Sequence, residues 1–296
     1  MKQKGEMKVN QSLQELFEGR VEQFVLKRKW QSGNYEKAEQ KLASFVKRSA
    51  DIVKVKARGN ILKRSVDGDF QTTIYQVHYQ YLIKQKGTLY QEEEVEVRMC
   101  KFFKNDLIMD KEINPYTKQP ELEFAAEDEQ EERISYQYNR LKAVQYAERW
   151  WNTYNPAFIK FENNCTNFIS QCLYAGGAPT RGYPNRGTGW WLRNKNYSYS
   201  WAVAHSMRLY LANSKSGLRA KEVSSPNQLL LGDVICYDFE GDGRYNHNTI
   251  VTAKDAYGMP LVNANTYNSR MRYWAYEDSS AYTPNIKYKF FTIVDG

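Results

Sequence analysis

One cysteine stands where a protein chain can activate a thiol. Cys165 follows Asn163 and Asn164, which are good helix caps, and the run that follows ends at Gly176 and Gly177. Apolar residues recur in this run at helical spacing: Phe168, Ile169, Cys172 and Leu173. The spacing predicts a short helix that starts at Cys165, where free backbone N–H groups and the helix dipole lower a thiol pKa. A free cysteine is more often an ordinary buried residue, so the rest of the chain must supply partners.

Two polar residues further along are candidates for those partners. Nucleophilic thiol catalysis needs a base that takes the proton and a polar group that orients the base. His247 stands at the mouth of a predicted strand, and Asn265 lies on the next one. Asn263 lies two residues earlier on the same face and is the alternative orienting residue. The order Cys165, His247, Asn265 is that of papain-type enzymes, whereas a structural reading has His247 simply bonded to its own loop.

An aromatic loop and an acidic loop are the other motifs. Trp190 and Trp191 stand in a loop rich in Gly, Arg and Asn, where they line a substrate groove or anchor the loop to the core. With Asn164 and Asn263 they form the candidate substrate-binding set. Asp238, Glu240 and Asp242 imitate the first half of a calcium loop, but Thr249 occupies the twelfth position, where a glutamate is required. The pattern therefore favours a rigid turn before His247, and no metal is expected.

Composition narrows the partners and the location. The chain has 296 residues, a formal charge of +8 and a pI near 9.1, which favours an anionic partner such as a cell-wall polymer. Acidic residues interleave with the basic ones and no nucleic-acid motif occurs, so no nucleic-acid partner is expected. No apolar stretch is long enough for a membrane span, and no apolar segment follows the basic N-terminus. Cytoplasmic residence is the default expectation, and a longer natural chain would leave an extracellular or cell-wall location open.

The periodicity predicts an α+β protein of two domains. Residues 1–115 form a module with helices at 11–29 and 35–55, the second ended by Gly59, followed by strands at 61–66, 70–84, 88–103 and 106–113. This order is similar in shape to cystatin or NTF2-like modules, and neither its function nor its partner follows from the sequence. Residues 116–133 read as an acidic linker. Residues 134–296 read as helices followed by an antiparallel sheet.

Several motifs of this second part resemble one family. They are Tyr136-x-Tyr-x-Arg140, Asn155-Pro156, Asn164-Cys-Thr-Asn-Phe-Ile-Ser-Gln-Cys172, Gly232-Asp233-Val-Ile-x-Tyr-Asp238 and His247-x-x-Ile-Val251. The combination resembles the putative amidase domain of many Firmicute proteins, and its plan is similar to that of CHAP-type bacterial cell-wall cysteine hydrolases. The chain departs from the usual pattern at Asn164 and Asn246, where the family has Asp. It also has Asn265-Thr266 where the family often has His-Thr.

The resemblance implies a papain-like thiol hydrolase of amide bonds, with Cys165 as nucleophile and His247 as base. Asn265 is the orienting residue, peptides or peptidoglycan stem peptides are the implied substrates, and no cofactor is required. Two alternatives stay open at this stage. One is a binding or structural protein on a degenerate hydrolase scaffold, and the other is an acyltransferase with the same triad.

Overall fold

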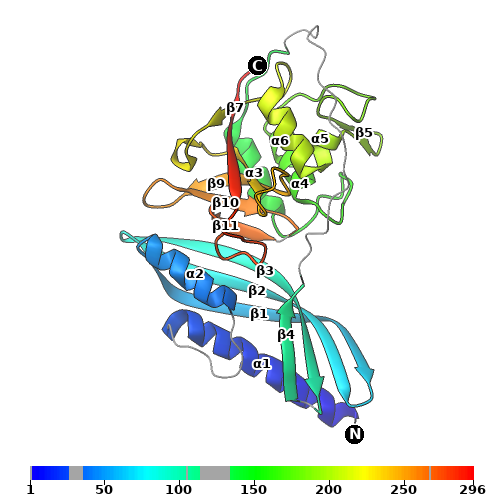
Figure 1. Cartoon of the computed structure of the whole chain (residues 1–296), viewed down its shortest axis with the longest axis vertical. Helices are drawn as coiled ribbons and strands as arrows, with labels where there is room; N and C mark the ends of the chain where they lie inside the picture. Colours follow the sequence, from blue (N-terminus) through cyan, green and yellow to red (C-terminus); the bar gives the residue numbers. More distant parts are fainter. Residues whose placement is uncertain (1, 27–35, 105, 114–133, 267) are drawn as a thin grey trace. The chain divides into compact units, whose positions relative to one another are not determined.

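The computed structural model describes residues 2–26, 36–104, 106–113, 134–266 and 268–296. The chain is an α+β protein that divides into two compact units, residues 1–114 with 277–280, and residues 115–276 with 281–296 (Figure 1). The predicted acidic linker at 116–133 lies outside the described residues. Within the described part of the chain, no helix is long and apolar enough to cross a membrane.

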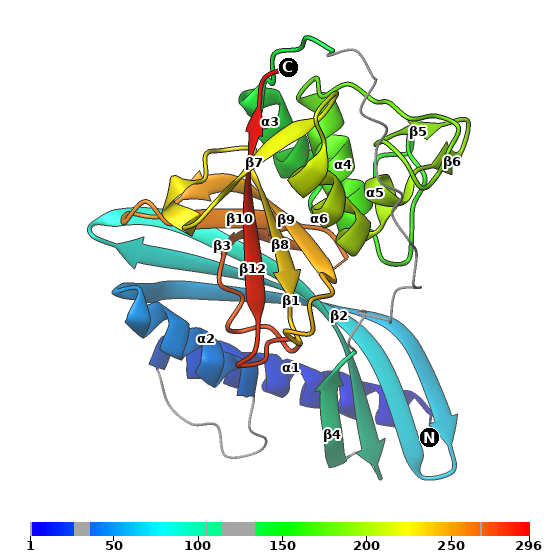
Figure 2. The ribbon, with the colours of Figure 1, turned by 45° about the horizontal axis from the view of Figure 1, so that its top comes forward.

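The first unit packs two helices on an antiparallel meander. Helices α1 (Lys2–Leu26) and α2 (Glu36–Lys47) precede strands β1 (Ala50–Asp67), β2 (Phe70–Gln85), β3 (Thr88–Phe103) and β4 (Asp106–Glu112), which pair in chain order. Both helices lie along the same face of this sheet (Figure 2). Tyr75, Tyr79 and Tyr81 alternate with polar residues along β2 and are fully buried, as the period of two predicts.

The predicted helix at 35–55 is wrong in its second half. Helix α2 ends at Lys47, Ser49 takes a positive φ of 51°, and β1 begins at Ala50. Ala50 already pairs with Gln85, so β1 follows β2 along the whole hairpin, and this pairing overrides the helical pattern. Gly59 ends no helix but lies within β1, where an added Cβ would stand 2.2 Å from the Phe17 ring of α1.

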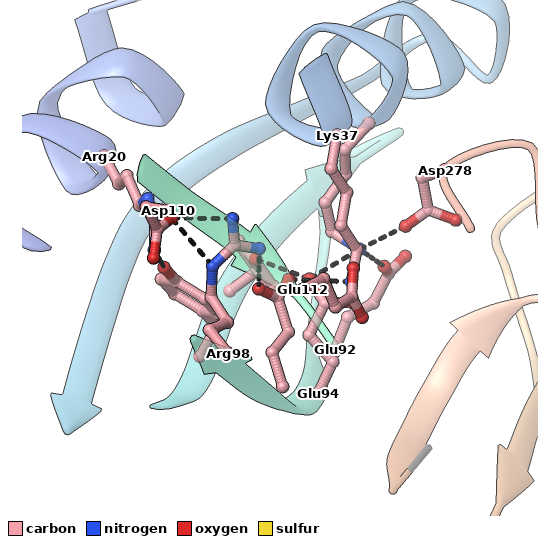
Figure 3. Close-up of polar contacts among 12 residues, drawn as sticks. Arg20, Lys37, Glu92, Glu94, Arg98, Asp110, Glu112 and Asp278 are labelled. Carbon is pink, nitrogen blue, oxygen red and sulfur yellow. Dashed lines mark hydrogen bonds and ion pairs between the residues drawn. The ribbon is translucent and has the colours of Figure 1, made fainter. Parts of the chain in front are cut away.

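Charged side chains fill much of the space between α2 and β3 (Figure 3). Glu94 and Glu96 lie two residues apart on the buried face of β3, and Lys37 Nζ lies 3.2 Å and 2.7 Å from their carboxylates. Arg98 donates to Glu96 at 2.9 Å and to Asp110 at 2.7 Å. A buried charge is tolerated when it is paired in this way, and removing one partner leaves the other unpaired at high cost.

The second unit packs helices on a six-strand sheet with the order β11-β10-β9-β8-β12-β7. Its helices are α3 (Arg140–Trp150), α4 (Cys165–Ala175), α5 (Tyr199–Ala202) and α6 (Ala204–Asn213). Its strands are β7 (Arg219–Val223), β8 (Val234–Asp238), β9 (His247–Lys254), β10 (Pro260–Ala264), β11 (Ser269–Tyr273) and β12 (Lys287–Val294). The short pair β5 (Leu192–Arg193) and β6 (Asn196–Tyr197) lies in the loop before α5, and a 3-10 turn spans Pro226–Gln228. Helix α4 begins at Cys165, as predicted, although the Asn164 side chain makes no capping hydrogen bond to its backbone.

Alternation along β8, β9 and β10 decides which side chains meet the helices. Tyr237, Val251 and Val262 belong to an apolar cluster on one face of the sheet. Side chains of the opposite parity point the other way, where Asn248 contacts Thr166 of α4 and Asn263 contacts Glu148 of α3. The papain-like arrangement of this unit stays a prediction.

Candidate active site

Cys165 is the first residue of α4 and is 2% exposed. Burial raises the pKa of its thiol above the ordinary value. The Thr166 hydroxyl and the backbone N–H groups of Asn248, Thr166 and Cys165 itself act in the opposite direction. The N–H groups of Cys165 and Thr166 are donors that the start of a helix offers to an anion, and that of Asn248 comes from β9. The other two cysteines of this unit, Cys172 and Cys236, lack this set of donors, and burial raises the pKa of both.

Asn164 and Asn265 form a buried clamp beside Cys165. The Asn265 Nδ2 donates to the carbonyls of Trp150, Trp151 and Thr153 at 3.2–3.3 Å, at the C-terminal end of α3. Because carbonyls only accept hydrogen bonds, this contact fixes the orientation of the amide. The Asn265 Oδ1 then accepts from Asn164 Nδ2 at 3.0 Å. Asn265 thus ties the end of α3 to the start of α4, and its amide is fully engaged in doing so.

Thr266 secures the same corner from the backbone side. Its hydroxyl accepts from the Asn164 N–H at 2.7 Å, and its φ is +98°. A β-branched residue in this region is an outlier, and such outliers persist only where the surroundings hold them. Strained backbone therefore lies directly against the residue that precedes Cys165.

His247 lies at the start of β9 with its ring among aromatic side chains. Its Nε2 is 3.4 Å from the Tyr276 hydroxyl, and its ring centroid is 5.3–6.1 Å from the rings of Tyr237, Phe239 and Tyr276. Burial, and to a lesser degree Arg272, lowers the pKa of this imidazole to about 3. The ring is therefore neutral at physiological pH and belongs to the sheet face opposite the one that carries Asn248.

The structure thus brings together Cys165, Asn164 and Asn265, with Asn248 in place of His247 on the helix side. Asn248 is the residue that sequence reasoning missed. Its side chain donates to Thr166 Oγ1 at 3.2 Å, and its backbone N–H is one of the groups that lower the pKa of Cys165. The alternation of β9 was the available signal, since His247 and its neighbour must point to opposite faces.

Asn263 shares a face with Asn265 but serves a different contact. Its Oδ1 accepts from the Thr252 hydroxyl and from the Met271 N–H, both at 2.8 Å. Its Nδ2 donates to Glu148 Oε1 at 2.8 Å, and Arg270 holds the other carboxylate oxygen of Glu148 at 2.6 Å. Asn263 therefore joins β10 to α3 through a half-buried ion pair.

Trp190 and Trp191 are 0% and 2% exposed. The Trp190 indole N–H donates to Ser170 Oγ of α4 at 3.0 Å, and that of Trp191 donates to the Asn185 carbonyl at 3.1 Å. Both contacts favour the anchoring interpretation, in which Trp190 fixes the loop against α4 and Trp191 holds the loop to itself.

The acidic loop before His247 is closed by its own backbone. Asp238 is fully buried, and its two oxygens accept from Gly241 and Gly243 N–H groups at 2.7 Å and 2.8 Å. This geometry fits the rigid turn that the sequence favours. Across the described ranges, no group of three or more His, Cys, Asp or Glu side chains is placed to hold a metal ion.

Comparisons with known proteins give two relatives and one family. A protein of Bacillus subtilis (strain 168) named uncharacterized protein YhbB is 52% identical over 283 residues, covering 92% of this chain and 90% of that protein. The uncharacterized protein YjcM of the same organism is 30% identical over 126 residues, covering 40% of this chain and 28% of that protein. No solved structure matches. The family model described as "putative amidase domain" matches residues 137–291, and the chain belongs to this family of amidase-type hydrolases.

Proposed function

We propose that this chain is a thiol hydrolase of amide bonds with Cys165 as its nucleophile. The observation that carries the proposal is the position of the Cys165 sulfur. It lies at the first turn of α4, where the backbone groups of Cys165, Thr166 and Asn248 lower the pKa of the thiol against the larger effect of burial. Such donors stabilise both a thiolate and the oxyanion that forms when it attacks a carbonyl.

His247 is the proposed base because it directly precedes Asn248, whose backbone N–H lowers the pKa of Cys165. In the resting geometry the His247 ring lies on the opposite face of the sheet, with its Nε2 near the Tyr276 hydroxyl, so proton transfer requires the start of β9 to turn this side chain to the α4 face. The resting enzyme therefore holds a neutral thiol and a neutral imidazole. Asn265 acts in this proposal as a positioning residue that fixes α4 through Asn164.

The reaction proceeds in two balanced steps. The Cys165 proton passes to His247, the sulfur bonds to the substrate carbonyl carbon, and the C–N bond breaks as the amine takes the proton. Water then gives a proton to His247 and attacks the thioester, releasing the acid and restoring the thiol. A peptide or peptidoglycan stem peptide suits the cationic chain as substrate, and an acceptor amine in place of water would give an acyltransferase.

A second candidate is favoured by the separation of His247 from Cys165. If β9 does not rearrange, the raised pKa of Cys165 and the neutral His247 leave no nucleophile. The unit would then bind peptides without cleaving them.

The test is acylation of Cys165 by amide substrates. The full chain is incubated with a mixture of peptide amides and with a peptidoglycan digest, quenched in acid and analysed by intact-mass spectrometry and peptide mapping. We expect a thioester adduct at Cys165 that Cys165→Ala abolishes, while Cys172→Ala, which alters another buried thiol of α4, retains it. Adding an acceptor amine distinguishes hydrolysis from acyl transfer. Peptide binding without any adduct would reject the hydrolase in favour of the second candidate.

A further inference from the structure

An arginine in the loop beside α4 is held between two aromatic rings. The Arg186 guanidinium carbon lies 4.4 Å from the Tyr197 ring centroid and 4.9 Å from that of Tyr199. Its Nε donates to the Tyr197 carbonyl at 3.0 Å. All three side chains are half-buried. Stacking and the Nε bond together fix the plane of the guanidinium group.

The backbone around Arg186 is fixed as well. The Arg186 carbonyl accepts from the Tyr199 N–H at 2.8 Å, and the preceding Asn185 carbonyl accepts from the buried Trp191 indole at 3.1 Å. Asn185 Oδ1 accepts from the Gly187 N–H at 2.9 Å. Because these hydrogen bonds already order the loop, Arg186 loses little conformational entropy when it binds a ligand, and this favours affinity.

Two successive contacts join this arginine to the start of α4. The Tyr197 ring packs edge-on against Phe161, with 4.8 Å between centroids. The Phe161 N–H donates to Asn164 Oδ1 at 3.2 Å, and Asn164 directly precedes Cys165. Arg186 therefore stands on the flank of the candidate active site, beyond a half-buried aromatic pair.

The two Nη groups of Arg186 are still available for a ligand. Within the part of the chain that the structure describes, they make no hydrogen bond or ion pair. A planar, permanently charged fork of donors is the group that best recognises a carboxylate. A lysine at this place would neither stack nor present two parallel donors.

We propose that Arg186 is a carboxylate-binding subsite for a peptide ligand whose scissile amide lies at Cys165. This inference rests on the proposed function for the place of the amide, and it adds the requirement for a carboxylate nearby. The carboxylate comes from an acidic side chain or from the C-terminus of the peptide, because the guanidinium fork binds both in the same way.

The experiment measures binding without chemistry, by calorimetry on the full chain carrying Cys165→Ala. Three acetylated pentapeptides serve as probes. They are Ala-Ala-Glu-Ala-Ala with an amidated end, Ala-Ala-Gln-Ala-Ala with an amidated end, and the latter with a free end. We expect a probe with a carboxylate to bind about tenfold more tightly than the neutral one, the lower end for a charge-assisted hydrogen bond. Preference for the first or the third probe identifies the source of the carboxylate.

Arg186→Gln should abolish the preference, and Arg193→Gln is the matched control. Arg193 stacks on Tyr183 in the same loop with 4.9 Å to the ring centroid, but it is exposed. If Arg186→Gln lowers the melting temperature strongly, Arg186→Lys retains the charge without the fork and should still lose most of the preference.

Equal affinity for all three probes, no binding of any, or a preference that survives both Arg186 variants would overturn the proposal. The binding readout is independent of Cys165 chemistry. A carboxylate preference without any acylation of Cys165 would therefore reject the hydrolase and leave the subsite standing.

Discussion

Replacing Asn265 with alanine should destabilise the second unit strongly, although this residue is not required to touch a substrate. The Asn265 amide is fully buried and joins three carbonyls after α3 to Asn164 before α4. The truncation removes the acceptor of the buried Asn164 Nδ2 and the side-chain donor to the Trp150, Trp151 and Thr153 carbonyls, so at least two polar groups lose a hydrogen bond. Each such group costs about 1–2 kcal/mol, so the free energy of unfolding should fall by about 2–4 kcal/mol.

Urea denaturation followed by tryptophan fluorescence measures this loss, because every tryptophan except Trp30 lies in the second unit. The melting temperature should fall by about 6–12 °C, at about 3 °C per kcal/mol for a domain of this size. Asn213→Ala is the matched control, since its amide also donates to a carbonyl at 2.8 Å but is exposed. A loss below about 0.5 kcal/mol, the range of ordinary surface substitutions, would refute the clamp.

Three further predictions concern other parts of the structure. Asp233→Asn should lower the free energy of unfolding by about 3–5 kcal/mol, because this fully buried carboxylate accepts hydrogen bonds from Arg140, Leu230 and Ile293. Urea denaturation measures this loss, with Asp242→Asn, which changes an exposed carboxylate, as the control. Because the pKa of His247 is lowered in the folded chain, the unfolded chain takes up a proton at His247 below about pH 6.5 that the folded chain does not. Stability should therefore be full above that pH and fall by about 1–2 kcal/mol by pH 5, and urea titrations at both pH values should show no such slope for His247→Gln. Gly59→Ala should cost about 1–3 kcal/mol by overpacking against Phe17, and the double variant with Phe17→Leu should recover part of it; an undiminished melting temperature for Gly59→Ala alone would contradict the close approach of α1.

Local patterns predicted the elements that depend on nearby residues. The start of α4 at Cys165 follows from its caps and apolar spacing, and β3 begins and ends where the turn residues before and after it indicate. The helix predicted at 35–55 fails because its second half pairs with a strand further along the chain, Ala50 with Gln85 and Val55 with Tyr81. Such long-range pairing is not visible in a local period.

The candidate site was predicted less completely than the fold. The residue types around Cys165 follow from the sequence, but the direction of His247 depends on its register with Tyr237. The role of Asn265 depends on three carbonyls in an irregular turn, which no side-chain pattern reveals. Arg186 could not be singled out from the sequence, because Tyr197 and Tyr199 stack against its guanidinium group only in the folded loop.

The central claim is that Cys165 alone among the cysteines is poised as a nucleophile. Its most direct test is the rate of iodoacetamide labelling of each cysteine against pH, read by peptide mass spectrometry in the wild type and in His247→Ala. The account predicts that Cys165 reacts faster than Cys172 and Cys236 throughout, because only its sulfur has the donors of α4 and Asn248. It also predicts that His247→Ala slows Cys165 alone, because the proposed rearrangement of β9 brings the imidazole to the Cys165 sulfur before the sulfur reacts. Equal, slow labelling of all three in both proteins would contradict the claim.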